Sequence, residues 1–176
     1  DRVHQDGPAR SVLAVVDVGT GFYQGAHLLH KPMGRSVHQS RTAGIPVINR
    51  IFDKEAVKDI PDSMCPVQTM LLTYTFDHRP DPSQFLASVA PILDADKGVL
   101  IIEVHDLEKI FERREFCLFE HEHSVYPTAS MMQRILSNAG FTLIEVGLLP
   151  ESERRANSLV VVATPHGSGL AKEALK

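Results

Sequence analysis

The chain has 176 residues, of which 43% are hydrophobic and 23% charged, so it can build one domain with its own core. This composition excludes a disordered chain and a miniprotein held together by disulfides. A formal net charge of −4 offers no basic surface for nucleic acid, and no apolar run reaches the length of a membrane span. The chain is therefore expected to bind neither nucleic acid nor membranes. Its two cysteines fit a reducing compartment, so an intracellular location is expected, in the cytoplasm or an organellar matrix.

Short apolar runs alternate with segments of helical periodicity along the chain. Nearly continuous apolar runs, typical of strands buried on both faces of a parallel sheet, occupy residues 11–16, 69–74 and 99–104, and residues 45–48 form a weaker strand whose proline makes it a poor central strand. Two further runs, residues 141–148 and 158–163, are separated by a polar loop and are expected to pair as an antiparallel hairpin. Strands that alternate with helices predict an α/β domain with a mainly parallel sheet.

Three segments between these strands carry helix signals. Asp81 and Pro82 form a cap and first-turn pair, and Thr128 and Gly140 bound a later helix. The core-facing residues expected from periodicity include Leu107, Ile110 and Phe111 in a short helix, and Met131 and Met132 in the later one. The domain is expected to span residues 11–165, between a lead-in of residues 1–10 and a loose tail of residues 166–176.

Glycines and histidines gather where the predicted strands end, which is the edge at which open α/β sheets bind ligands. Gly19 and Gly21 follow the first strand and suit either a plain tight turn or a close approach of the backbone to a ligand. His78 and His105 follow later strands, and histidine is the usual proton shuttle near neutral pH. For each histidine taken alone, a position in an exposed polar loop is the better explanation.

The segment from residue 120 to residue 126 is the strongest candidate for chemistry. Glu122 stands beside His123, and a carboxylate can orient an imidazole for general base catalysis, with the phenol of Tyr126 as a second proton carrier. A metal site through His121 and His123 is a second interpretation. The sequence shows no clear third ligand, so acid–base chemistry without a metal is expected.

Five stretches together resemble a known enzyme family. They are residues 17–21 (Asp-Val-Gly-Thr-Gly), 44–53, 75–82, 98–104 and 121–126 (His-Glu-His-Ser-Val-Tyr). In this order they resemble the motifs of class I S-adenosylmethionine-dependent methyltransferases, and they look closest to the branch that includes sugar C-methyltransferases. The His-Glu-His-x-x-Tyr run is the most specific of the five, and the glycine-rich run is the least specific.

The resemblance implies a Rossmann-like, mainly parallel seven-stranded sheet whose last strand is antiparallel. It also implies S-adenosylmethionine as the cofactor and base-assisted methyl transfer to a small-molecule acceptor, with a sugar as one candidate. The cofactor-binding residues implied are Asp17, Gly19, Thr20, Gly21 and Asp53. The catalytic residues implied are His123 as the base, Glu122 to orient it, and Tyr126 and His78 to position the acceptor.

The chain departs from the family pattern after the predicted glycine-rich motif. The family holds the ribose hydroxyls of its cofactor with an acidic residue, but residues 34–40 contain neither Asp nor Glu. Losing such a charged acceptor costs about 1.5–3 kcal/mol of hydrogen bonding. A second hypothesis is therefore a methyltransferase-like domain without cofactor that acts as a scaffold or assembly subunit among protein partners.

Overall fold

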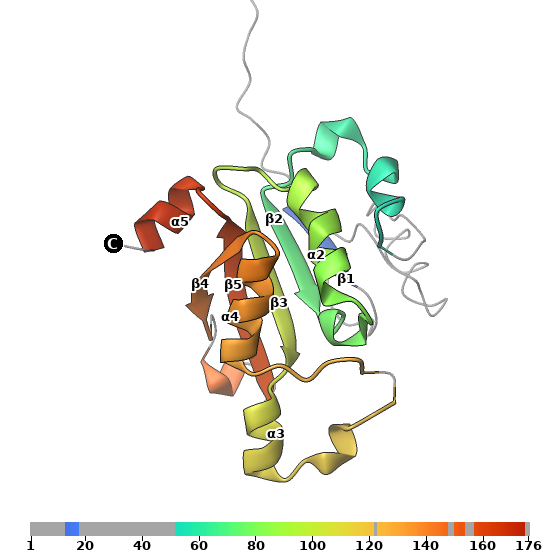
Figure 1. Ribbon diagram of the computed structural model, residues 1–176, viewed down its shortest axis with the longest axis vertical. Helices are drawn as coiled ribbons and strands as arrows, with labels where there is room; N and C mark the ends of the chain where they lie inside the picture. Colours follow the sequence, from blue (N-terminus) through green and yellow to red (C-terminus); the bar gives the residue numbers. More distant parts are fainter. Residues whose placement is uncertain (1–12, 18–51, 122, 148–149, 154–156, 175–176) are drawn as a thin grey trace, which may run out of the picture.

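A computed structural model describes residues 13–17, 52–121, 123–147, 150–153 and 157–174 of the chain. Within these residues, five strands form one mixed sheet in the order β1-β2-β3-β5-β4 (Figure 1). Their bounds are Leu13–Asp17 for β1, Thr69–Thr73 for β2, Val99–His105 for β3, Phe141–Val146 for β4 and Ser158–Pro165 for β5. The predicted α/β class is confirmed. The expected strand at residues 45–48 lies outside the described residues.

The strand directions confirm the predicted hairpin at the end of the domain. β1, β2 and β3 are parallel, whereas β5 is antiparallel to both β3 and β4. Among the described strands, β5 is therefore the one that runs against the others. Every residue of β5 from Ser158 to Thr164 is buried, which explains why its sequence is a continuous apolar run rather than an alternating one.

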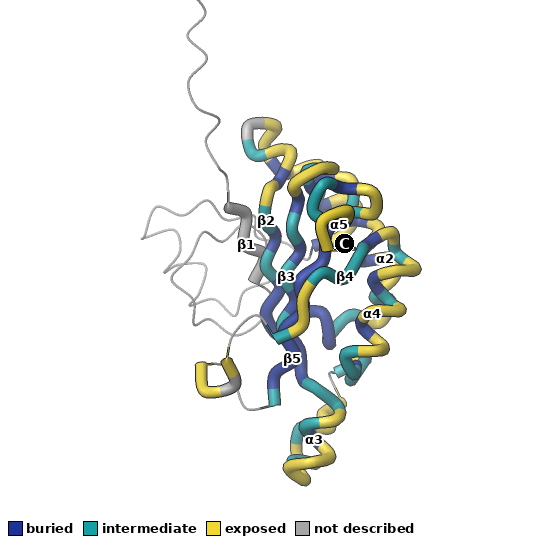
Figure 2. Tube along the Cα trace, turned by 90° about the vertical axis from the view of Figure 1, so that its left-hand side faces the viewer, coloured by how far each residue is buried: buried dark blue, intermediate teal, exposed yellow. Residues whose placement is uncertain are grey.

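Two helices pack on one face of the sheet and contribute side chains to the core (Figure 2). Helix α2, Pro82–Val89, begins where the Asp81 carboxylate accepts the Gln84 amide at 2.9 Å, as the sequence predicts. Helix α4, Ala129–Asn138, begins at Thr128, whose hydroxyl accepts the Met131 amide at 3.3 Å. The largest fully buried side chains of the core are Phe52, Phe76, Phe141, Met70, Leu72, Leu86, Leu100, Ile102, Ile110, Met132 and Leu136.

Two residues expected in the core lie on the surface instead. Met132 is buried in α4, but its neighbour Met131 is 43% exposed, because successive residues of a helix point about 100° apart. Helix α3, Leu107–Arg113, buries Ile110 and leaves Phe111 57% exposed for the same reason. In both helices, the buried face is therefore narrower than the apolar pattern of the sequence indicates.

The segment expected to be a loose tail contains a helix. Helix α5, Gly169–Ala174, begins after Ser168, whose hydroxyl accepts the Ala171 amide at 3.0 Å. Both Ser168 and Ala171 are buried, so this turn packs against the domain. Short 3-10 helices complete the described elements: Ala56–Asp59, Asp62–Met64, Phe76–His78, Ala90–Ile92, Phe116–Leu118 and Glu151–Glu153. None of the described helices has the length and apolarity that crossing a bilayer requires.

Candidate active site

The candidate site lies at the carboxyl ends of the three parallel strands. Asp17, the last residue of β1, pairs with Thr73, the last residue of β2, and Thr73 pairs with Glu103 near the end of β3. The turn Phe76–His78 and the last residue of β3, His105, therefore lie at one edge. Open α/β sheets bind ligands at this edge. The glycine-rich run begins here too, although Gly19, Thr20 and Gly21 lie outside the described residues.

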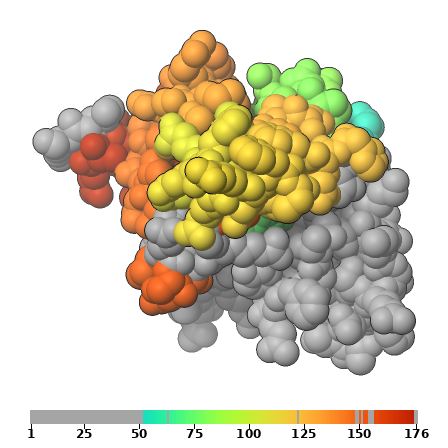
Figure 3. Space-filling model, turned by 90° about the horizontal axis from the view of Figure 1, so that it is seen from below, coloured from blue at the N-terminus to red at the C-terminus, as the bar shows by residue number. Residues whose placement is uncertain are grey.

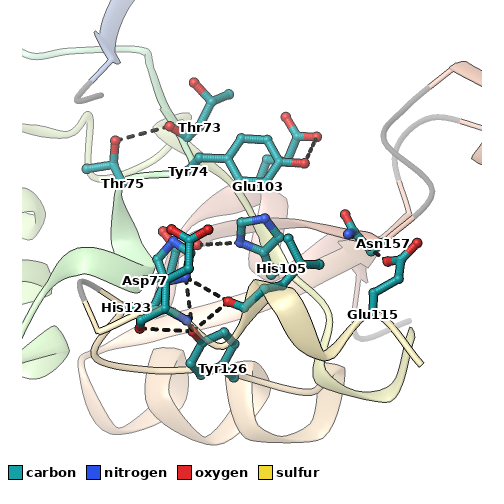
Figure 4. A network of polar contacts seen from close by, with 12 residues as sticks. Thr73, Tyr74, Thr75, Asp77, Glu103, His105, Glu115, His123, Tyr126 and Asn157 are labelled. Carbon is teal, nitrogen blue, oxygen red and sulfur yellow. Dashed lines mark hydrogen bonds and ion pairs between the residues drawn. The ribbon is translucent and has the colours of Figure 1, made fainter. Parts of the chain in front are cut away.

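A buried carboxylate–imidazole pair forms the inner part of the site (Figure 4). Asp77 Oδ2 lies 3.0 Å from His105 Nδ1, and these residues are 0% and 7% exposed. Because an ionised carboxylate only accepts hydrogen bonds, Nδ1 carries the proton in this arrangement. The second carboxylate oxygen, Oδ1 of Asp77, is buried and has no hydrogen-bond partner in the described part of the chain. Within the described residues, no hydrogen bond therefore offsets the desolvation of that oxygen.

His123 and Tyr126 form the outer part of the site, in the loop that the sequence singled out. His123 Nδ1 lies 3.0 Å from the Tyr126 hydroxyl and 3.3 Å from the Leu118 carbonyl oxygen. A carbonyl oxygen cannot donate, so Nδ1–H is the donor and Nε2 keeps its lone pair. The Tyr126 hydroxyl donates to Leu118 at 2.8 Å and accepts the Glu120 amide at 2.8 Å, which closes the loop on itself.

The inner and outer parts meet through their rings. The His123 ring centroid lies 4.6 Å from that of His78 and 5.1 Å from that of His105. The structure thus brings together His78, His123 and Tyr126, three residues that the sequence predicted for one site. His121 is exposed and does not join the group of close donor atoms formed by Asp77, His105 and His123. Glu122 lies outside the described residues.

Sequence reasoning did not assign Asp77, Tyr74 or Glu103 to the site and left His105 without a role. Tyr74 contacts the His105 ring with a centroid distance of 4.8 Å and donates its hydroxyl to Glu103 Oε1 at 3.2 Å. Its backbone is left-handed, with φ of 47°, a strained conformation for a non-glycine residue that concentrates at functional sites. The polar residues at the ends of these strands were a signal for a site. Local sequence, however, does not show which strands pair, and so it does not show which of these residues meet.

Asp53, expected at the cofactor, has a structural contact of its own. It is exposed, and its Oδ1 accepts the amides of Glu55 at 3.0 Å and Ala56 at 2.8 Å at the start of a 3-10 helix. Burial lowers the pKa of Arg79, while the charge of Asp53 raises it. The Arg79 guanidinium lies 5.1 Å from the Phe85 ring centroid. Asp53 therefore helps to neutralise a partly buried cation beside α2.

An aromatic surface adjoins the site at the same end of the sheet. Phe111, Phe116 and Phe119 are 57%, 51% and 45% exposed and contact one another with ring centroids 5.8–6.3 Å apart. Phe119 also contacts Tyr126, with centroids 4.9 Å apart. The segment from α3 to this loop lies on the surface at that end (Figure 3). The aromatic surface is thus exposed at its phenylalanines and reaches Tyr126, whose hydroxyl contacts His123.

A family model described as "Methyltransferase domain" matches residues 8–146 of the chain. The chain belongs to this methyltransferase family. The match covers the strands, turns and loop that build the candidate site. S-adenosylmethionine is the cofactor of the family, and structural neighbours of the domain were crystallised with it or with its product, S-adenosylhomocysteine. No curated protein matches the chain at a significant level.

Solved methyltransferase structures share the fold. OxaC in complex with S-adenosylhomocysteine and oxaline is 14% identical over 86% of this chain, with a TM-score of 0.60. The 1,6-didemethyltoxoflavin-N1-methyltransferase of Burkholderia thailandensis is 16% identical, with 86% of this chain and 70% of that chain covered and a TM-score of 0.58. A putative methyltransferase in complex with the Haloferax volcanii Trm112 activator is 17% identical, with 90% and 87% covered and a TM-score of 0.59. The chain spans about a third of OxaC, 35% of its length.

Proposed function

We propose that this methyltransferase domain is an active enzyme that transfers a methyl group from S-adenosylmethionine to a small-molecule acceptor, with a sugar-like compound as one candidate. The observation that carries the proposal is the position of His123. It stands at the carboxyl edge of the parallel strands, where its Nδ1–H is held by Tyr126 and Leu118. An imidazole held through one nitrogen presents the other to a substrate in a defined direction. The proposal also includes completion of the sheet to seven strands, as in the resembling family.

The cofactor-binding role is proposed for Asp17, Gly19, Thr20 and Gly21, with Asp53 as a further contact. The described part of the chain supports this because β1 ends at Asp17, which pairs with Thr73, and Thr73 lies four residues before Asp77 in the chain. Glycines directly after such a strand let the backbone approach a ligand closely. The cofactor supplies a methyl group on a positively charged sulfur, which is already an activated donor. The protein then needs to contribute proximity and a base.

The base proposed is Nε2 of His123. It accepts the proton that leaves the acceptor atom as that atom forms its bond to the methyl group. Tyr126 fixes the ring through Nδ1, and Glu122 is proposed to assist in orienting it. His78, whose ring lies 4.6 Å from that of His123, is proposed to position the acceptor. The buried Asp77–His105 pair supports the ring of His123 from the inner side.

A cofactor-free scaffold is the second candidate function, and one observation favours it. Residues 34–40 lack the acidic residue with which the resembling family holds the ribose of its cofactor. One structural neighbour is a putative methyltransferase in complex with a Trm112 activator, so a protein partner is part of this alternative. An intracellular location, in the cytoplasm or an organellar matrix, belongs to both proposals.

Calorimetric titration with S-adenosylhomocysteine separates the two candidates. Saturable binding at micromolar concentrations supports the enzyme, and no binding at millimolar concentrations supports the scaffold. The variant Gly19→Val places a branched side chain in the proposed cofactor cleft. It is expected to keep the far-UV circular dichroism of the wild type and to lose the binding. If it folds and binds normally, the cleft lies elsewhere.

A further inference from the structure

We propose that Asp77, His105 and His123 also form a binding site for one divalent transition-metal ion, and that an ion bound there blocks methyl transfer. One donor atom of each side chain lies within 4.8 Å of those of the other two. Metal binding stands on this geometry alone. The inhibition rests on the proposed function, because the ion and the methyl acceptor would compete for the same imidazole.

The hydrogen bonds show which nitrogen of each imidazole an ion can use. His105 Nδ1 is occupied by Asp77 Oδ2, and His123 Nδ1 is occupied by Tyr126 and Leu118. Because Nε2 of His105 points away from the carboxylate, an ion shared with Asp77 has to displace the Nδ1 proton of His105 and bind that nitrogen, while His123 keeps the lone pair of Nε2. Histidines that ligate metals usually donate their other N–H to a carboxylate or another oxygen, which fixes the tautomer and the ring orientation. His123 already has such a contact through Nδ1.

The buried carboxylate gives an independent reason to expect a cation. Asp77 is 0% exposed, and its Oδ1 has no hydrogen-bond partner in the described part of the chain. Buried carboxylate oxygens in native proteins are nearly always paired, since desolvation without compensation is costly. A divalent ion held by the Asp77 carboxylate and the two imidazoles would supply that compensation. His123 is only partly buried, so the outer side of the site is open to an entering ion.

The donor set selects the kind of ion. Two imidazole nitrogens and one carboxylate oxygen suit Zn²⁺, Co²⁺ or Ni²⁺, whereas Mg²⁺ and Ca²⁺ prefer oxygen ligands alone. Zinc binds such ligands at about 2.0–2.2 Å, which places tetrahedral donors about 3.4 Å apart. Asp77 Oδ2 and His105 Nδ1 are already 3.0 Å apart, so His123 is the side chain that has to approach the ion. Three protein ligands would leave a fourth position for water.

The experiment uses the full chain after treatment with a chelator, with Zn²⁺ measured by calorimetry and Co²⁺ by its visible absorption. One equivalent is expected to bind with a Kd in the micromolar range or below. His105→Gln and His123→Gln are each expected to weaken binding by about 10–100-fold or more, the scale on which groups of a metal site act. His121→Gln is the matched control, because His121 is exposed in the same loop and outside the group. Far-UV circular dichroism checks that each variant folds.

The outcomes separate the metal site from the proposed function. A wild-type protein that binds no Zn²⁺, or binding that His121→Gln weakens as much as His123→Gln does, overturns the metal site and leaves the enzyme proposal untouched. Binding lost only in the two ligand variants supports the site even if the chain fails to bind S-adenosylhomocysteine. In an active preparation, one equivalent of Zn²⁺ is expected to suppress turnover, and a chelator is expected to restore it. Turnover that is unchanged with the site filled overturns the inhibition.

Discussion

Asp77 and His105 are 28 positions apart in the chain, yet their side chains meet at 3.0 Å in the interior of the protein. Asp77 comes from the turn after β2, and His105 ends β3, so the parallel pairing of these strands creates the contact. The backbone of the same turn also holds the loop of residues 116–126, because the Asp77 carbonyl accepts the Ser124 amide at 2.6 Å. One residue thus links the inner imidazole to the loop that carries His123.

Removal of the Asp77 carboxylate is expected to destabilise the protein. In Asp77→Ala, the N–H of the buried His105 loses its acceptor, which costs about 1–3 kcal/mol in free energy of unfolding. Urea denaturation followed by circular dichroism measures this cost. Glu173→Ala is the control, because Glu173 is exposed in α5, and it is expected to change the unfolding free energy by less than about 0.5 kcal/mol. Equal stability of Asp77→Ala and the wild type would contradict the role given to the pair.

The hydroxyl of Tyr126 is expected to hold the loop in its closed shape. Tyr126→Phe removes the donor to the Leu118 carbonyl and the acceptor for the Glu120 amide, both at 2.8 Å. Amide hydrogen exchange is therefore expected to speed up at Glu120 and at neighbouring loop positions, while β3 keeps its protection. Tyr74→Phe is the control, because it removes a tyrosine hydroxyl that donates to Glu103 in β3. Equal exchange rates of the loop amides in the wild type and in Tyr126→Phe would show that other contacts close the loop.

Much of the fold could be predicted because several of its strands stand out in the sequence as apolar runs. Strand β3, Val99–His105, and strand β5, Ser158–Pro165, are continuous apolar runs, as buried strands of this kind are. The cap residues Asp81 and Thr128 likewise set the starts of α2 and α4. The positions of Phe111 and Met131 could not be predicted, since apolar periodicity does not say how wide the buried face of a helix is.

The candidate site could be predicted only where its residues are close together in the sequence. His123 and Tyr126 are three residues apart and were recognised together, and their contact at 3.0 Å follows from the loop between them. Asp77 and His105 required the register of two parallel strands, which the sequence does not encode in any short motif. The tautomer of His123 depends on the Leu118 carbonyl, a backbone group that no residue pattern reveals.

Asp94 gives the turn before β3 a dependence on pH. Amides of Lys97 and Asp96 donate to its Oδ1 at 2.8 and 2.9 Å and lower its pKa from the ordinary value of 3.8. A lowered pKa in the folded state means that this contribution to stability is present above pH 3.8 and is lost as the pH falls through the folded value.

Asp94→Ala is therefore expected to lower the melting temperature at pH 7, and the difference from the wild type is expected to shrink below about pH 4. Asp62→Ala is a control on the surface, with an exposed aspartate for which no amide contact of the side chain is found in the described residues. Melting curves recorded from pH 7 to pH 3 make the comparison. A difference that stays constant down to pH 3 would assign the effect to the shape of the turn rather than to the ionised carboxylate.

The most informative variant for the proposed function is His123→Asn. Asparagine can keep a hydrogen bond to the Tyr126 hydroxyl, but it has no basic nitrogen with which to accept the proton of an acceptor. Turnover, measured as S-adenosylhomocysteine formed from a panel of small hydroxylated acceptors, is expected to fall by about 10²–10⁴, the usual contribution of a general base. Binding of S-adenosylhomocysteine is expected to stay unchanged. His121→Asn, in the same loop but exposed, is expected to retain wild-type turnover. Wild-type turnover in His123→Asn would mean that transfer depends on proximity alone and that His123 serves to hold the loop.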